Sequence, residues 1–237
     1  MLSMSDSDIS LSLGTALDKL SKLDFDYLII GGLLCKSILG NHGRPVDDID
    51  LICDTDFKKI EEMFKKQFDV VRFDYYSFSK VATEESFTSV IKINGENIII
   101  EGRRFDIFNK IKKETYKIGN HSFKGVPIEF QIAEKIIAMF SVPVPSYKHL
   151  VDLYSFSLLD ESVANRREIK RYFDLLLSYK NEIKKKLGLP ILKSTHFVDP
   201  NQEFDGSFYL SSLQAQHNYS RDYLVNKINE WLSSLSI

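Results

Sequence analysis

Pairs of aspartates separated by one residue occur four times in this chain of 237 residues, and one pair has a distinctive setting. Asp48 and Asp50 alternate with aliphatic residues in DIDLICD (48–54), so we expect them on a central strand. Side chains two residues apart on a strand point to the same face, about 7 Å apart. Two carboxylates on an apolar sheet need a compensating cation, and Mg²⁺ typically binds one or two carboxylates together with substrate phosphates.

The other three pairs fit local backbone chemistry. One lies in the polar N-terminus, one precedes an expected strand where a turn is needed, and one precedes an expected helix and can cap it. These pairs are Asp6/Asp8, Asp24/Asp26 and Asp54/Asp56. The pattern also argues against a calcium-binding EF-hand, because DIDLICDTDFKK has no glycine at loop position 6 and ends in lysine.

Two glycines precede the Asp48/Asp50 pair. Gly31 and Gly32 end the aliphatic run DYLIIGG (26–32), which predicts a buried strand entering a tight turn, and LLCKSILG (33–40) predicts a short helix after it. Backbone N–H groups at such a turn can bind a phosphate chain. Arg44, four residues before Asp48, could also reach a phosphate or brace the acidic pair.

The remaining pattern divides the chain into two domains. In residues 1–127, the apolar spacing predicts helices at 8–23 and 56–67. Strand-forming residues follow in three segments, FDVVRFDYYSF, ESFTSVIKI and NIIIEGRRFDIF. Asn94-Gly95 predicts a hairpin turn between the last two segments, and a second small hairpin is expected around Gly119-Asn120. Residues 128–237 return to the helical period, with an apolar stripe from Ile132 to Phe140, helices expected at 147–159 and 164–187, and a last amphipathic helix. We therefore predict an α/β domain followed by an all-helical domain.

Composition and charge indicate the cellular compartment and the kinds of partner to expect. The formal charge of −2 argues against a chain-wide positive field, although a local basic face is compatible with it. Cys35 and Cys53 are too few for a disulfide framework and favour buried thiols in a reducing compartment. The N-terminus has no signal-peptide pattern, and no apolar run reaches the roughly 18–20 residues that span a bilayer. A cytoplasmic protein without a membrane partner is expected.

The stretch YLIIGGLLCKSILGNHGRPVDDIDLICD resembles the nucleotidyltransferase superfamily of the DNA polymerase β type, and in particular its bacterial AbiEii/AbiGii toxin branch. That branch shows a GG and then R-x-T-x-D-I-D, with Val46 here in place of the Thr. A second block, IEFQIAEKIIAM (128–139) and YKHLVDLYSF (147–156), resembles its E-K-L-x-A-L helix and K-D-x-x-D-L. Lys148 and Asp152 match, and His149 stands where an Asp is usual. The resemblance covers about residues 25–160.

The resemblance implies a fold, an activity and roles. The fold is an α+β (α/β) mixed sheet with flanking helices, followed by a C-terminal helical bundle. The activity is transfer of a nucleoside monophosphate from an NTP, with Mg²⁺ or Mn²⁺ as cofactor. Asp48 and Asp50 would hold the metal. Residues expected to bind the NTP are Gly31, Gly32, Arg44, Lys135 and Lys148.

The fold also implies a third carboxylate on a neighbouring strand. Asp106 is favoured, because RRFDIF looks like a continuous strand around it and related sequences often read R-x-D-[IL]-F. Glu101 is the alternative, and it precedes Gly102, which suggests a strand end or a bulge. Asp106 is accordingly predicted as catalytic and metal-binding together with Asp48 and Asp50.

The acceptor stays open at the level of sequence. The toxin-like resemblance implies an RNA 3′ end, such as that of a tRNA, or a protein side chain, and an antitoxin partner; small-molecule acceptors of the antibiotic type are also modified by this fold. The alternative is a catalytically inactive nucleotide-binding or interaction module. The segment 166–193 holds nine basic residues against three acidic ones, so it is the predicted phosphate-contacting surface if the acceptor is RNA.

Overall fold

The protein is described from a computed structural model, in which residues 9–40, 46, 48–77, 84–141, 144–160, 162–192, 198–199, 201, 203–205 and 220–235 are described. The chain divides into two compact units, Met1–Pro127 and Ile128–Ile237.

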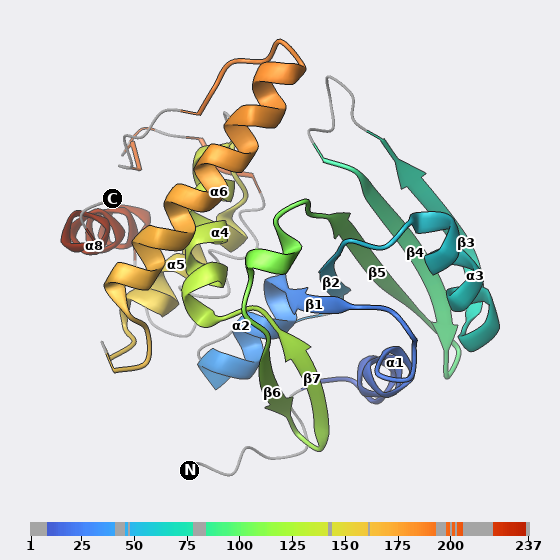
Figure 1. Cartoon of the computed structure of the whole chain (residues 1–237). Helices are drawn as coiled ribbons and strands as arrows, with labels where there is room; N and C mark the ends of the chain where they lie inside the picture. The colour runs from blue at the N-terminus through green and yellow to red at the C-terminus, as the bar shows by residue number, and fades with distance from the viewer. Residues whose placement is uncertain are drawn as a thin grey trace. The chain divides into compact units, whose positions relative to one another are not determined.

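The first unit is built on a seven-stranded mixed sheet (Figure 1). The strand order is β3-β4-β5-β2-β1-β7-β6, with β2 parallel to β5, β1 parallel to β7, and the other neighbours antiparallel. The strands are β1 (Tyr27–Ile30), β2 (Asp48–Cys53), β3 (Asp69–Tyr76), β4 (Ser86–Ile93), β5 (Glu96–Arg104), β6 (Glu114–Ile118) and β7 (His121–Gly125).

Helix α3 (Phe57–Gln67) covers one face of β3 and β4 (Figure 1). It begins where the Asp56 carboxylate accepts hydrogen bonds from two backbone N–H groups of its first turn. Its apolar stripe meets the sheet through Phe57 and Phe64, whose rings contact the Phe87 ring edge-on at centroid distances of 5.3 and 5.8 Å. This face of the sheet is therefore the apolar one. The other helices of the unit are α1 (Leu11–Leu20) and α2 (Gly31–Leu39).

The hairpin predicted at Asn94-Gly95 is confirmed. Asn94 and Gly95 have φ values of 52° and 84°, the left-handed conformation that a two-residue hairpin turn requires at both central positions. The second predicted hairpin is also present, as β6 and β7.

The prediction that a strand continues through residues 105–108 is wrong. Strand β5 ends at Arg104, level with Cys53 at the end of its partner β2, and the Phe105 N–H makes a last bond to the Cys53 carbonyl. Beyond that point no neighbouring strand remains for pairing, so the chain turns into a short 3₁₀ helix, η2 (Phe108–Lys110). The apolar residues of FDIF are buried in this turn instead of in a strand.

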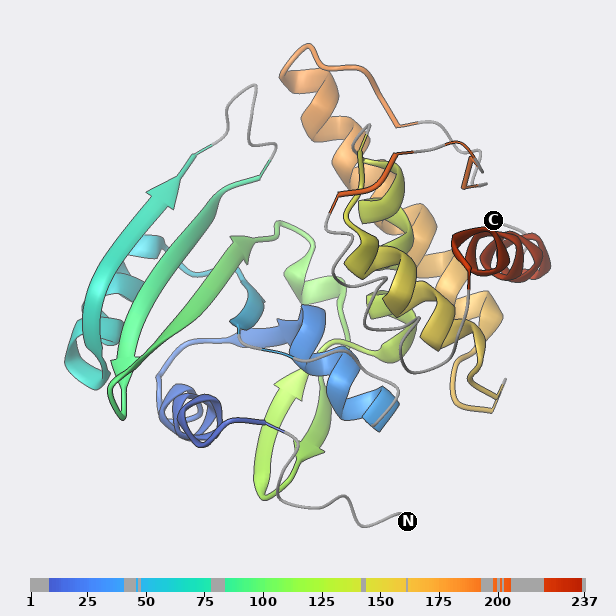
Figure 2. The same ribbon diagram turned by 180° about the vertical axis from the view of Figure 1, so that it is seen from behind.

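The second unit is helical in its described residues (Figure 2). Helix α4 packs against both α5 and α6, and α8 packs against α5. The helices are α4 (Ile128–Phe140), α5 (Tyr147–Ser157), α6 (Arg166–Lys186) and α8 (Arg221–Ser234). Because α4 has neighbours on two sides, most of its surface is buried, including the polar side chains Gln131, Glu134 and Lys135.

The predicted fold class, a mixed sheet with flanking helices followed by helices, is confirmed. Cys35 and Cys53 are buried and form no disulfide. Within the described part of the chain, no helix combines the length and apolarity needed to cross a bilayer.

Candidate active site

Gly31 and Asp50 lie against each other at the end of β1. The two strands pair so that Ile30 is opposite Asp50, and the chain enters α2 at Gly31 directly afterwards. Gly31 has φ +75°, a backbone conformation that residues other than glycine rarely adopt. A Cβ at this position would overlap Asp50 Oδ2 and lie 2.8 Å from its carboxyl carbon. The glycine is thus required both by its backbone conformation and by the Asp50 carboxylate.

The two aspartates of β2 lie on the same face of the sheet. Both are half-buried, whereas Ile49 and Leu51 between and after them are fully buried on the opposite face. The register connects Leu51 to Gly102 and Gly102 to Phe87, which contacts α3. The aspartates therefore occupy the face opposite α3, as the alternating pattern of β2 predicts.

Glu101 lies directly opposite Asp50. Strands β2 and β5 are parallel, and their register pairs Asp50 with Glu101, so the two side chains emerge on the same face from neighbouring strands. Glu101 lies within β5 and not at its end, because Gly102 continues the pairing on both sides. The expectation that Gly102 marks a strand end is wrong. A Cβ at Gly102 would overlap the Phe87 ring, which explains the glycine by packing.

Asp106 lies outside strand β5, in the turn that follows it. Three residues of strand, about 10 Å, separate Glu101 from Arg104, and the exposed Asp106 follows in the turn beyond that end. The choice of Asp106 as third carboxylate rested on a continuous strand through residues 105–108, which the fold lacks. The register instead makes Glu101 the candidate.

The donor set at β2 suits a hard divalent cation. Asp48 and Asp50 offer carboxylate oxygens only, and Asp50 is approached by glycine backbone with no side chain in between. Among the described residues, no three or more His, Cys, Asp and Glu side chains are grouped to hold a metal ion. Mg²⁺ is usually held by one or two protein carboxylates, and water and phosphate oxygens fill its remaining coordination positions. The residues present fit this ion.

The first turn of α2 can receive an anion. Ile30, which precedes the helix, has an apolar side chain and therefore cannot cap the helix by a side-chain hydrogen bond. The buried Gly31 and Gly32 start the helix without side chains that would block the approach of a ligand. A helix N-terminus of this kind favours phosphate through its N–H groups and dipole. Arg44, the predicted companion of this turn, lies outside the described residues.

Lys135 forms a buried ion pair in the second unit. Its Nζ lies 2.9 Å from Asp152 Oδ2, and the two side chains are only 4% and 1% exposed. The pair joins α4 to α5. Lys148, the other predicted NTP-binding lysine, is half-buried in the first turn of α5, where its backbone N–H donates to Ser146 Oγ at 3.4 Å.

His149 borders this ion pair. Burial, reinforced by the positive charge of Lys135, lowers the pKa of His149 from 6.5 to about 3. Its buried Nδ1 has no hydrogen-bond partner in the described structure. The imidazole is therefore neutral at physiological pH and adds no positive charge beside Lys135.

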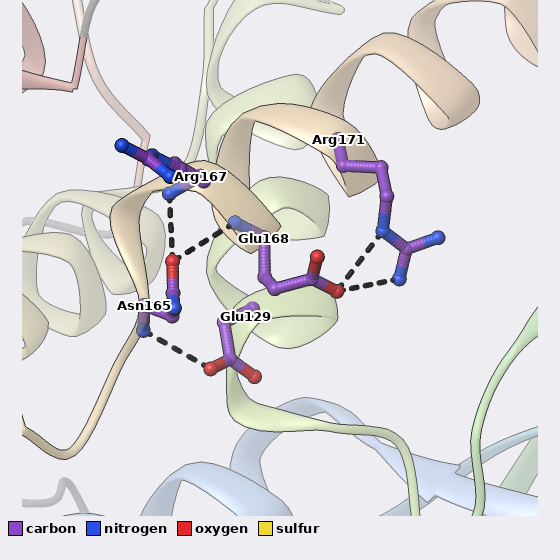
Figure 3. Close-up of polar contacts among 5 residues, drawn as sticks. All are labelled: Glu129, Asn165, Arg167, Glu168 and Arg171. Atoms are coloured by element: carbon purple, nitrogen blue, oxygen red, sulfur yellow. Dashed lines mark hydrogen bonds and ion pairs between the residues drawn. The ribbon is translucent and has the colours of Figure 1, made fainter.

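The basic segment predicted at 166–193 is helical over α6 and partly neutralised by its own acidic residues. Lys170 pairs with Asp174 at 2.9 Å and Arg171 with Glu168 at 2.8 Å. Figure 3 shows the start of the helix: Asn165 accepts hydrogen bonds from the backbone of Arg167 and Glu168, and its own N–H donates to Glu129 at 3.0 Å.

The start and the end of α6 offer exposed basic side chains. In Figure 3 the Arg167 side chain points away from Glu129 and Glu168. Arg167, Lys185 and Lys186 are exposed. These three side chains present positive charge to solvent at the two ends of the helix.

No protein-family model matches the sequence, and no curated protein sequence is similar to it. Solved structures are similar in fold. A candidate nucleotidyltransferase from Helicobacter pylori superposes with a TM-score of 0.51 at 13% identity, over 96% of each chain. An antigenic nucleotidyltransferase-like protein from Paracoccidioides brasiliensis gives 0.46 at 17% identity, over 82% of this chain and 98% of its own. The antibiotic-resistance factor ANT(2'')-Ia gives 0.47 at 13% identity, over 73% and 94%.

The Helicobacter pylori structure has a TM-score above 0.5 and extends over nearly the whole of both chains, so it identifies the fold as that of the nucleotidyltransferases. At 13% identity this likeness concerns the fold and does not extend to substrate. The nucleotidyltransferase-type fold class predicted from the sequence, a mixed sheet with flanking helices, is confirmed.

Proposed function

We propose that this protein is a divalent-metal-dependent nucleotidyltransferase that moves NMP from an NTP to a hydroxyl group. The observation that carries the proposal is the contact of Gly31 with the Asp50 carboxylate. It joins a phosphate-binding helix start to a pair of metal-binding carboxylates at one point of the sheet. A nucleoside triphosphate needs both features.

Each residue has a distinct task in this proposal. The N–H groups at the start of α2 bind the β- and γ-phosphates and hold the α-phosphate beside β2. Asp48 and Asp50 would hold Mg²⁺ or Mn²⁺, which when bound supplies neutralising charge for the triphosphate. Glu101, opposite Asp50, accepts the proton of the acceptor hydroxyl. The acceptor oxygen then bonds to the α-phosphorus, and the bond from that phosphorus to the β-phosphate oxygen breaks, which releases pyrophosphate.

An RNA 3′ hydroxyl is the acceptor that we propose. The sequence resemblance to the AbiEii/AbiGii toxins supports it, as do the exposed basic residues Arg167, Lys185 and Lys186 on α6. Basic side chains on a helix bind backbone phosphates whatever the nucleotide sequence, and a tRNA-like substrate presents such phosphates. A toxin of this class would also have an antitoxin as partner.

The activity test is transfer of label from each α-³²P-NTP to total tRNA in the presence of Mg²⁺. We expect label in the tRNA band, and its loss by at least a hundredfold in Asp50→Asn. Asp54→Asn is the matched control, since Asp54 is exposed at the end of β2 and should leave transfer unchanged. Equal transfer by the Asp50 and Asp54 variants would refute the assignment of the site.

The acceptor is tested separately. In parallel reactions with total protein in place of tRNA, label should stay absent; label in protein alone would replace RNA as the acceptor and leave the site assignment intact. Transfer to tRNA should fall steeply between 50 and 200 mM salt. The double variant Lys185→Ala, Lys186→Ala should flatten this dependence, whereas Lys170→Ala, which removes a paired lysine, should change it little.

A further inference from the structure

A pocket of about 360 Å³ opens in the first unit between the α1–β1 connection and the β6–β7 hairpin, two segments that the ion pair of Lys113 with Asp26 also links. Three aromatic side chains contribute to its wall: Phe25, Tyr27 and Phe123. The Phe25 and Tyr27 rings lie 5.1 Å apart between centroids and are tilted by 41°, and Phe123 is only 5% exposed. Pockets for small molecules measure about 300–1,000 Å³, so this one suits a molecule of one or two rings.

The mouth of the pocket is positively charged. Lys113 and Lys124 both line it, and a single carboxylate, Asp26, faces them. Asp26 Oδ1 lies 2.8 Å from Lys113 Nζ and so offsets that charge. Lys124 Nζ instead donates to the neutral Thr115 hydroxyl at 2.7 Å, which fixes the ammonium group and leaves its charge uncompensated by that contact. A negatively charged group on a ligand would therefore be favoured next to Lys124.

Hydroxyl groups add hydrogen-bonding capacity around the same opening. Ser122 and Thr115 stand on the two strands of the hairpin that line the pocket. The phenol of Tyr27, which also lines the pocket, is protonated at physiological pH and supplies a further O–H donor. An aromatic wall, a fixed ammonium group and hydroxyl donors together define the chemistry of the occupant.

We propose that this pocket binds a small planar aromatic anion, with its ring against Phe25, Tyr27 and Phe123 and its charged group at Lys124. The pocket lies at the start of β1, at the opposite end of the strand from Ile30 and Gly31. The strand between Tyr27 and Ile30 spans about 10 Å. The site is thus separate from the nucleotide-binding position, and its existence does not depend on the proposed transferase activity.

The test uses the full chain and 8-anilinonaphthalene-1-sulfonate, a fused aromatic sulfonate whose fluorescence rises on binding. We expect one saturable site with a dissociation constant in the micromolar range. Lys124→Glu should weaken binding at least fivefold. Lys92→Glu is the matched control, because Lys92 is an exposed lysine on β4 that does not line the pocket, and it should change binding less than twofold. Lys92 and Lys124 are both exposed, so the variants should fold.

A neutral analogue and a map of the site complete the design. N-phenyl-1-naphthylamine lacks the sulfonate, so it should bind the wild type more weakly than the sulfonate does. Its affinities for the wild type and for Lys124→Glu should be equal. In amide NMR spectra, the sulfonate should shift resonances of residues 21–27 and 113–124. Absence of saturable binding, equal weakening by Lys92→Glu, or shifts confined to other segments would each overturn the proposal.

Discussion

Replacing Gly31 with alanine tests the centre of the candidate site. The added Cβ meets two penalties: a φ of +75°, which costs a residue other than glycine about 1–2 kcal/mol, and overlap with the Asp50 carboxylate. Asp50 must shift as well as rotate, because its Cβ would lie 2.9 Å from the new Cβ, and holding a side chain off its preferred rotamer costs about 1 kcal/mol. We expect Gly31→Ala to lower the free energy of unfolding by about 2–3 kcal/mol in total.

Gly95→Ala provides the matched control. Gly95 has φ +84° in the β4–β5 turn, and nothing lies within 4 Å of the position of its Cβ. This variant therefore carries the backbone penalty alone, about 1–2 kcal/mol. Urea denaturation of both variants separates the two costs, because the difference between them reports the overlap with Asp50.

The same pair of variants separates stability from chemistry. Displacement of a catalytic group by about 1 Å can cost on the order of a hundredfold in rate, so Gly31→Ala should lose NMP transfer to that extent while Gly95→Ala retains it. Both are assayed well below their unfolding transitions with α-³²P-NTP and Mg²⁺. If Gly31→Ala transfers label within twofold of Gly95→Ala, the Asp50 carboxylate is not positioned by this glycine and the reasoning fails.

Three further predictions concern other charged groups. Glu101→Gln should reduce transfer about a hundredfold or more, as expected for loss of a general base, and Asp106→Asn less than twofold; the reverse order would restore Asp106 as the third carboxylate. Asp152→Asn leaves the buried Lys135 without its carboxylate and should cost about 3–5 kcal/mol in urea denaturation, more than the double variant Lys135→Met, Asp152→Leu. The pKa of His149 is about 3 in the folded chain and 6.5 unfolded, so its contribution to stability is complete above pH 6.5 and lost as pH falls toward 3. The free energy of unfolding should drop by about 3 kcal/mol from pH 7 to 4, and His149→Gln should show a shallower slope.

Most of the elements could be predicted because local pattern and tertiary packing agree. The DIDLICD segment alternates correctly for a strand with one polar face, and Asn94-Gly95 has the residues that a two-residue turn needs. The FDIF segment shows the opposite case. Its residues favour a strand, but pairing depends on a neighbour, and β2 has already ended at Cys53.

The candidate site, like the fold, could be predicted only where local sequence determines it. Spacing alone places Asp48 and Asp50 on one face of a strand, whereas their partner in the sheet depends on strand order, which no single segment encodes. The alternation of NIIIEGRR was the available signal for Glu101, since buried Ile98, Ile100 and Gly102 leave Glu101 on the other face. The pairing of Lys135 with Asp152 is likewise a product of how α4 and α5 pack.

The register of β2 has a consequence for the kinds of change this gene can tolerate. Side chains alternate between the two faces, so an insertion or deletion inside β2 that slipped the strand by one position would move both carboxylates to the opposite face, where Ile49 and Leu51 are now fully buried. There they would be buried without water or a cation. Substitutions in this strand would reduce activity by degrees, whereas an insertion or deletion inside it would remove the site altogether. Homologues should therefore vary in the length of the connections around β2 and keep the spacing inside it constant.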